Sequence, residues 1–372
     1  MRSAEIITNP QKWINNSQLL FIIVITRNIT WITLTPVITS GYTRQDAWIS
    51  TIIAMVVSLL WMIVIIAIHK RMPTKTLGQI INKVFGAYIG KLILLVFFAY
   101  FMLIAGHQLS LIRVIKSVLL LETPDAVIRW SILFVIWYAL YKGPASLIRT
   151  TGLIFFIMLL NKVLIATFLM PQLDFQQLKP VLYYGWRPVL VGSIVPTALF
   201  FETIFVLHLL PMVKDNKGAR KLPFIGIIFS GLMLVLLVIM LIAIFGPVEA
   251  EQLQFPFYSL AREVSIGDFI ERVEALIVVV WLTNLFISIT LMLYMAREML
   301  VQISKRLQQY NQYINVGLIV MLGILGSRLF ANTVDISNFY HPMQYGLIGF
   351  LVPGLIPIIM YIVMLIRKQG VK

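Results

Sequence analysis

Residues 25–36 read ITRNITWITLTP, and Arg27 lies inside an otherwise uncharged stretch that runs from Leu19 to Pro36. Such a stretch is typical of a helix that crosses a lipid bilayer, for which about 20 apolar residues suffice. Inserting an arginine at the middle of such a helix costs about 2.5–3.5 kcal/mol, so we expect it to face the protein interior and to find a partner there. The stretch therefore predicts a membrane protein with a buried polar centre.

The composition of the whole chain supports this interpretation. Hydrophobic residues occupy 60% of the 372 positions and charged residues 12%, with a mean hydropathy of +0.92. Soluble proteins have roughly half apolar and about a quarter charged residues. The chain has no cysteine, which excludes disulfides and thiolate metal ligands. Residues 1–16 are polar and lack the apolar core of a signal sequence. We expect one membrane domain over residues 1–372, located in the cell membrane.

Ten stretches are long and apolar enough to be candidate membrane spans. They cover residues 18–36, 47–68, 92–115, 127–141, 150–170, 188–212, 223–246, 275–296, 314–331 and 345–366. The expected fold is therefore an all-α integral membrane protein with ten transmembrane helices. They divide into two sets of five, over 18–170 and 188–366. Because five is odd, the second set begins on the opposite face, and any repeat between the sets is inverted, as in one class of secondary transporter.

The lysines and arginines predict the orientation of these spans. Nineteen of the 30 fall on the side of the N-terminus, nine fall on the other side, and two, Arg27 and Lys162, lie within spans. Because positive charge is enriched in cytoplasmic loops, both termini are expected in the cytoplasm. The net charge of +15 then reflects topology and contact with anionic membrane lipid, so no nucleic-acid binding is expected.

Charged side chains within the spans are the candidate functional residues. Arg27 lies nine residues into the first span, and Glu202 lies nine residues before Pro211 in the sixth. At 1.5 Å per residue both are roughly 14 Å deep, near the middle of the membrane. Lys162, twelve residues past Thr150, is expected at a similar depth. Arg27 and Glu202 form either a buried pair that only fixes helix packing or part of a ligand site.

Several motifs, together with the ten-span layout, resemble the spore germination permease family over nearly the whole chain. They are Asp46-Ala-Trp-Ile-Ser50, Lys179-Pro-Val-Leu182, Phe200-Phe-Glu202, Leu210-Pro211, and the block from Phe255-Pro256 through Arg262–Glu274 to Trp281. The resemblance implies a B subunit of a nutrient germinant receptor in the spore inner membrane, with A and C subunits as partners. It also implies the amino acid–polyamine–organocation superfamily, whose LeuT-like transporter fold has the five-plus-five inverted repeat.

In that fold the first, third, sixth and eighth spans surround a small ligand, here expected to be a nutrient such as an amino acid. The expected ligand-binding residues are Thr26, Arg27, Asn28, Thr30, Tyr100, Ile104, Thr197, Phe200, Phe201, Glu202, Asn284 and Ser288. Superfamily members commonly break the first span at glycine, but no glycine precedes Gly41 here. Arg27 is therefore a candidate to bind the ligand carboxylate bidentately in place of free backbone amides. Lys162 is the candidate to replace a coupling sodium ion, and Glu202 is the second candidate coupling residue.

The remaining motifs predict little chemistry. Ser265-Ile-Gly-Asp268 is a capping-box pattern, and Asp268 could pair with Arg272, in either a folding element or a contact for a partner subunit. His107 and His208 are expected to be hydrogen-bonded interior groups. No metal-ligand spacing or enzyme motif is present in the sequence, and no cofactor is expected. Three functions stay open: a receptor subunit, an active amino-acid permease coupled to protons, and a structural subunit.

Overall fold

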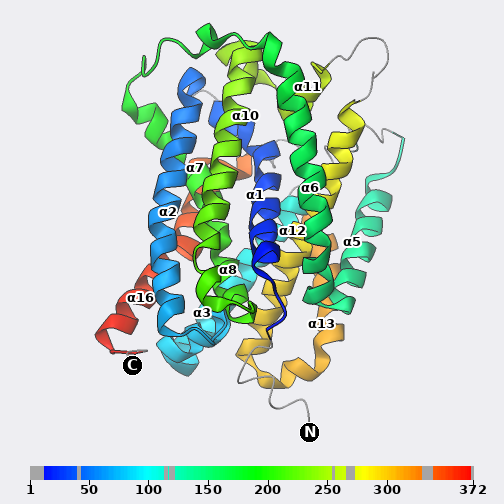
Figure 1. Cartoon of the computed structure of the whole chain (residues 1–372). Helices are drawn as coiled ribbons and strands as arrows, with labels where there is room; N and C mark the ends of the chain where they lie inside the picture. Colours follow the sequence, from blue (N-terminus) through cyan, green and yellow to red (C-terminus); the bar gives the residue numbers. More distant parts are fainter. Residues whose placement is uncertain are drawn as a thin grey trace.

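The computed structural model describes residues 12–39, 43–112, 116, 122–253, 256–264, 273–328 and 338–369, without the side chains of 29–39, 273–277 and 305. Its regular structure over these residues is helical (Figure 1). The long helices are α1 (Asn16–Thr39), α2 (Ala47–Arg71), α3 (Leu77–Ser110), α5 (Asp125–Lys142), α6 (Pro144–Leu169), α7 (Trp186–Phe201), α10 (Leu222–Gln252), α12 (Val273–Ile303), α13 (Asn311–Arg328) and α16 (Ile356–Ile366). The short ones are η2 (Arg44–Asp46), η3 (Met170–Gln172), η4 (Phe175–Leu178), η5 (Glu202–Phe205), α8 (Val206–Leu209), η6 (Leu210–Met212), α9 (Asn216–Ala219), α11 (Pro256–Arg262), η8 (Lys305–Tyr310), η9 (Pro342–Gly346), α15 (Leu347–Gly349) and η10 (Phe350–Leu355).

Seven helical segments in the described residues are long and apolar enough to cross a membrane. They are Arg44–Arg71, Leu77–Ser110, Pro144–Gln172, Trp186–Met212, Asn216–Gln252, Val278–Ile303 and Pro342–Ile366. They coincide with seven of the ten expected spans; the other three, 18–36, 127–141 and 314–331, coincide with α1, α5 and α13. The chain is an all-helical, multi-pass membrane protein. Ten crossings and an inverted repeat stay predictions.

Two glycines and a proline shift helix boundaries away from those expected. Gly86 has a φ of 79° inside α3, which begins at Leu77 instead of near 92, and Gly246 has a φ of 74° inside α10. Glycine adopts positive φ without a steric penalty, so the chain bends there and continues as helix. Helix α6 begins at Pro144, six residues before the expected start, because proline fits the first turn of a helix.

The first and sixth spans differ in continuity. The sixth changes from α-helix to 3₁₀-helix at Glu202, where α7 gives way to η5. The sequence left open whether the first span unwinds without a glycine, and α1 is helical without a break from Asn16 to Thr39. The hydroxyl of Thr26 donates to carbonyls of its own preceding turn, which a helix tolerates without unwinding.

Helix burial shows which spans form the centre of the bundle. In their most apolar stretches, 83% of the residues of Trp186–Met212 and 78% of those of Val278–Ile303 are buried, against 28% in Pro144–Gln172. Helix α1 packs against α6, α7, α10 and α12. The centre therefore consists of α1, α7 and α12, whereas α6 lies at the lipid-facing periphery (Figure 1).

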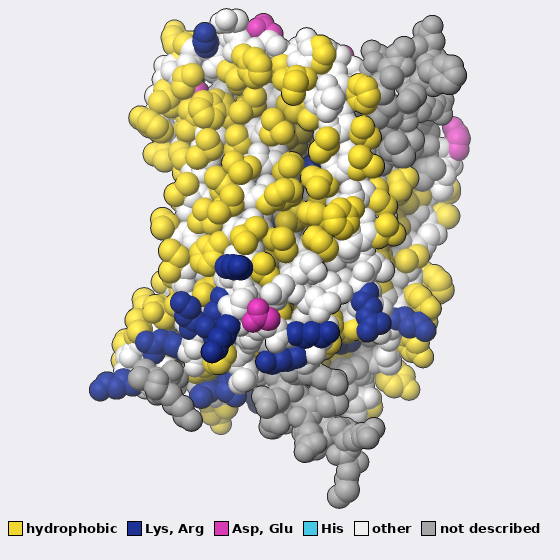
Figure 2. All heavy atoms as spheres, viewed as in Figure 1, with side chains coloured by type: hydrophobic (Ala, Val, Ile, Leu, Met, Phe, Trp, Pro, Cys, Tyr) yellow, Lys and Arg dark blue, Asp and Glu magenta, His cyan; other side chains and the backbone are white. Residues whose placement is uncertain are grey.

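One end of the bundle, called the basic end below, carries most of the positive charge. Here the end of α2 meets the end of α16 through Arg71 Nη1, which donates to the Gln369 carbonyl at 3.1 Å, and Arg367 donates to Val84 of α3 at 2.8 Å. Lysines and arginines form a band at this end, next to a broad hydrophobic surface (Figure 2). This distribution agrees with the expected cytoplasmic location of this end, which remains a prediction.

Candidate functional site

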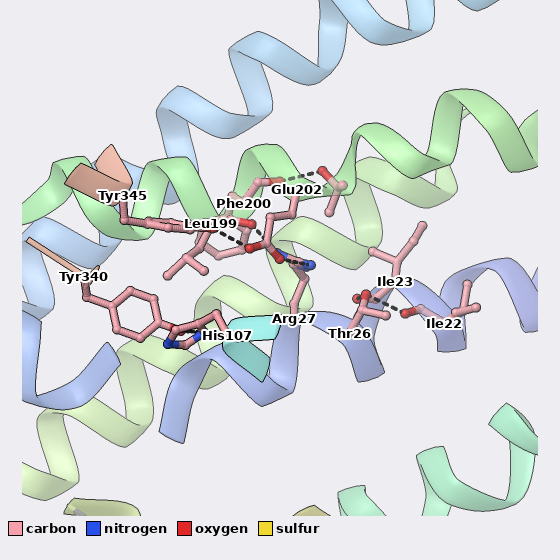
Figure 3. A network of polar contacts seen from close by, with 11 residues as sticks. Ile22, Ile23, Thr26, Arg27, His107, Leu199, Phe200, Glu202, Tyr340 and Tyr345 are labelled. Carbon is pink, nitrogen blue, oxygen red and sulfur yellow. Dashed lines mark hydrogen bonds and ion pairs between the residues drawn. The ribbon is translucent and has the colours of Figure 1, made fainter. Parts of the chain in front are cut away.

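A buried ion pair joins α1 to the break in the sixth span. Arg27 Nη2 lies 2.7 Å from Glu202 Oε2, and each side chain is 1% exposed (Figure 3). The residues are 175 positions apart in the sequence. The expected pairing of the two charged residues is therefore present in the structure, whereas a role in ligand binding is a separate question.

The change of helix type at Glu202 makes backbone acceptors available to side chains. Arg27 Nη1 also donates to the Leu199 carbonyl, and the Thr203 hydroxyl donates to the Phe200 carbonyl at 2.6 Å. Carbonyl groups in the last turn of an α-helix lack the usual partner four residues on, so they accept from elsewhere. The junction between α7 and η5 thus places the Glu202 carboxylate and the Leu199 carbonyl side by side toward Arg27.

Tyr345 completes the site and was missed in the sequence. Its hydroxyl donates to Glu202 Oε1, and its side chain is 1% exposed (Figure 3). It lies on η9, a π-helical turn, a type of turn that is often found at functional sites. The available signal was a tyrosine in an apolar span, because a buried hydroxyl needs a partner. The family resemblance implied a site between the first, third, sixth and eighth spans, and Tyr345 belongs to the tenth.

Aromatic rings extend from Tyr345 toward α3. Its ring centroid lies 5.3 Å from that of Phe339 and 5.4 Å from that of Tyr340. The Tyr340 hydroxyl is 3.2 Å from His107 Nδ1, and the His107 ring stacks on Phe339 at 4.9 Å. His208 is 3.3 Å from the Tyr294 hydroxyl. Both histidines are therefore hydrogen-bonded interior groups, as expected.

Asn28, Asn284 and Ser288 are among the expected ligand-binding residues that carry buried polar atoms without a hydrogen-bond partner among the described residues. These atoms are Asn28 Oδ1, both amide atoms of Asn284, and Ser288 Oγ. Asn28 is 5% exposed, and Asn284 and Ser288 are fully buried. Four residues apart, Asn284 and Ser288 share one face of α12, and α12 packs against α1 and α3. These groups can hydrogen-bond a small polar molecule between the central helices.

Other expected residues are committed to contacts within the protein. The hydroxyls of Thr26 and Thr197 donate to carbonyls of their own helices at 2.8 and 2.7 Å, which satisfies them locally. The Phe201 ring packs on Trp61 of α2 at 4.8 Å and on Phe350 of η10 at 5.2 Å. Phe201 therefore faces α2 and η10.

The remaining expected residues are buried near the ion pair or cannot be described. Tyr100 and Ile104 are buried on α3, and Phe200 is buried on α7. Tyr100 is close enough to Glu202 and Tyr345 to interact with both. The side chain of Thr30 lies outside the described residues, as do the capping box of 265–268 and the possible pair of Asp268 with Arg272.

Lys162 lies nearer to one end of its helix than the sequence predicted. Because α6 begins at Pro144, Lys162 lies 18 residues from its start and only seven before its end at Leu169. It is thus displaced from the middle of the helix toward the end opposite the basic end. Its Nζ lies 5.1 Å from the ring centroid of Phe257 on α11.

In the part of the chain that the structure describes, no group of three His, Cys, Asp or Glu side chains could hold a metal ion. The two charges of the ion pair compensate each other, and the described polar groups of the central helices include amides, hydroxyls and the His107 imidazole. Such a site can bind an uncharged polar molecule, or a zwitterion whose two charges complement Arg27 and Glu202.

Comparison with known proteins gives concordant matches. A family model described as spore germination protein matches residues 13–331. Spore germination protein XB of Bacillus anthracis is 30% identical over 283 residues, covering 76% of this chain and 78% of that protein. Spore germination protein YndE of Bacillus subtilis (strain 168) is 25% identical over 346 residues, 92% of this chain and 93% of its own. Spore germination protein KB of the same strain is 26% identical over 258 residues, 67% and 68% of the two chains.

Proposed function

The chain belongs to the spore germination protein family, and on this premise we propose that it is a transporter-like subunit of a spore germinant receptor. It binds a small nutrient, an amino acid in the first instance, within the spore inner membrane and helps to trigger germination together with A and C subunits. The family consists of germination proteins and not of enzymes, and the proposed site accordingly binds a ligand without transforming it. In this proposal the fold is the ten-helix, five-plus-five inverted repeat with both termini in the cytoplasm.

The observation that carries the proposal is the set of buried polar atoms on α1 and α12 that have no hydrogen-bond partner among the described residues. Each buried polar group without a partner costs about 1–3 kcal/mol. Asn284 and Ser288 lie on one face of α12 with three such atoms among the described residues. Two apolar residues at these positions would give a more stable bundle. The presence of Asn284 and Ser288 instead favours a ligand that supplies the missing hydrogen bonds.

The ion pair supports a zwitterionic ligand. Arg27 donates to Glu202 and to the Leu199 carbonyl, so its guanidinium can exchange one acceptor for a ligand carboxylate. Glu202 accepts from Arg27 and Tyr345 and can exchange one of them for a ligand ammonium group. Binding would then alter the contacts of α1 and of η9 with the sixth span, and a ligand that favours one set of contacts shifts the bundle toward it.

The test uses an isosteric replacement with a matched control on the same helix. Asn284→Leu removes both unpaired amide atoms, so we expect an unfolding temperature equal to or above that of the wild type. Binding of labelled amino acids to the purified protein should weaken by about fivefold or more, since a lost pair of hydrogen bonds costs about 1–3 kcal/mol. The control is Thr290→Val, because Thr290 is equally buried but donates to its own helix at 2.6 Å. Wild-type binding and germination by Asn284→Leu would refute the ligand role.

The permease alternative is separated by uptake. Ionisable groups inside membrane helices often mark proton routes, and Glu202 and Lys162 are two such groups. Vesicles that contain the purified protein should bind labelled amino acid without accumulating it if the chain is a receptor subunit. Accumulation driven by an imposed pH gradient would instead show an active permease.

A further inference from the structure

A groove lies between α6, α10 and α11. It encloses about 80 Å³ and is lined by Lys162, Val163, Ile165, Ala166, Met233, Leu236, Leu237, Met240, Phe257 and Leu260. Nine of these ten residues are apolar and the tenth is a lysine. The central ion pair and its polar neighbours do not line the groove, so its chemistry is separate from that of the proposed nutrient site.

The groove opens toward the lipid-facing surface of the bundle. Its rim residues Val163 and Leu236 are 51% and 45% exposed, while Ile165 and Leu260 at its floor are buried. The rim belongs to α6 and α10, which present apolar side chains over most of their length (Figures 1 and 2). The molecules that meet this opening in a membrane are therefore lipid acyl chains.

The depth of Lys162 places its amine near the boundary between headgroups and acyl chains. Helix α6 has 26 residues, so it is about 39 Å long, compared with about 30 Å for a hydrocarbon core. If the excess is shared by the two ends, the seven residues that follow Lys162 put its Cα about 6 Å inside the core. A lysine side chain can extend over such a distance toward the interface.

We propose that this groove binds an acyl chain of an anionic lipid from the surrounding membrane, with the Lys162 ammonium paired to the lipid headgroup. Apolar walls with a single cation fit a molecule with an apolar body and one negative charge. An amino-acid zwitterion does not fit, because its ammonium group would have no polar partner among the other nine lining residues. A lysine ammonium has three donors, so it can bind a headgroup in addition to contacts within the protein, including the ring of Phe257.

A lipid chain in the groove would contact helices that pack against the centre of the protein. Both α6 and α10 pack against α1, and α11 contacts α1, α10 and α12. A lipid chain between α6 and α10 therefore supports the helices that hold Arg27. The inference does not depend on the identity of the nutrient, or on whether the central site binds one.

The test uses photoactivatable lipids that carry the reactive group in the acyl chain, with the full-length protein in lipid nanodiscs. A phosphatidylglycerol probe should label peptides that contain Met233–Met240 or Phe257–Leu260, and a phosphatidylcholine probe should label them at least fivefold less. Lys162→Met should reduce labelling by the anionic probe to the phosphatidylcholine level, while Lys162→Arg should retain it. Equal labelling by the two probes, or unchanged labelling in Lys162→Met, would overturn the proposal.

A second variant covers the case in which Lys162→Met does not fold. Ala166→Leu fills the groove one turn along α6 and leaves the lysine in place. It should lower labelling by the anionic probe at the same peptides, with unchanged labelling elsewhere on the protein. Folding of each variant is checked by elution as a single species in size-exclusion chromatography. Undiminished groove labelling in Ala166→Leu would also overturn the proposal.

Discussion

Replacing the members of the central ion pair, singly and together, should show whether they act as a unit. Arg27 and Glu202 are each 1% exposed and their charged atoms lie 2.7 Å apart, so removal of one strands the other in the membrane interior. The usual cost of such a removal is about 3–5 kcal/mol. In Arg27→Met the carboxylate loses the guanidinium and keeps the hydrogen bond from Tyr345. In Glu202→Gln the guanidinium keeps the Leu199 carbonyl and gains an amide oxygen. Arg27→Met should therefore be the more destabilising change.

The double replacement Arg27→Met with Glu202→Gln leaves no uncompensated charge. Tyr345 can still donate to the new amide oxygen at position 202, so the loss of unfolding free energy should be about 3 kcal/mol smaller than the sum of the two single losses. The assays are the thermal unfolding temperature of the purified protein and its amount in spore membranes. Single variants as stable as the wild type, or a double variant with an additive loss, would refute the reasoning from burial.

The same variants separate the ligand role from a purely structural pair. If Arg27 and Glu202 bind the nutrient, the double variant should regain normal amounts in the membrane without regaining germination. Full germination by the double variant would show that the pair only fixes helix packing. Germination is measured by the loss of optical density of a spore suspension after addition of nutrient.

Three further predictions concern topology, close packing and pH. Reporter fusions after Lys217 and at Glu251 should lie on opposite sides of the membrane, with the Lys217 fusion in the cytoplasm; identical signals would contradict the assigned orientation. Gly349→Ala should lower the unfolding temperature, because its new Cβ would lie 2.5 Å from a side chain of α7, whereas Gly317→Ala, with open space around it, should not; equal effects would contradict the packing argument. A backbone N–H of α9 lowers the pKa of Asp215 below its ordinary value of 3.8, so the stability that its charge confers is present above this pH and is lost as the pH falls below it. The wild type should unfold at a higher temperature than Asp215→Asn at pH 7, and this advantage should decline progressively as the pH falls below 3.8; an advantage at pH 3 as large as that at pH 7 would argue against ionisation as its cause.

The sequence was sufficient for every property that depends on local composition. Long apolar stretches predict membrane helices because hydrocarbon excludes unpaired backbone groups, and each expected stretch coincides with a helix of the structure. The positive charges of the loops predicted a basic end, which the structure shows. The equal depth of Arg27 and Glu202 in their spans also predicted that they form an ion pair, since a charge inside the membrane needs a partner.

The sequence was less informative about where helices begin and bend. The shift of Lys162 toward one end of α6 follows from a start at Pro144, and α1 continues through Thr26, whose hydroxyl bonds within its own helix. The residues on both sides of these helix boundaries are apolar. A hydropathy pattern therefore does not show whether a helical turn lies inside the membrane span or next to it. The sequence likewise does not show which glycines adopt a positive φ, because this depends on the path of the backbone.

Only the tertiary structure decided which side chains share the centre. Tyr345 bonds Glu202 from η9, 143 residues away in the sequence, and Phe201 turns toward Trp61 although it is adjacent to Glu202. In a bundle whose helices are apolar on all sides, composition does not specify which face of a helix is buried or which helix it meets. Crossing angle and rotation about the helix axis select those contacts, and both are set by the packing of the whole bundle.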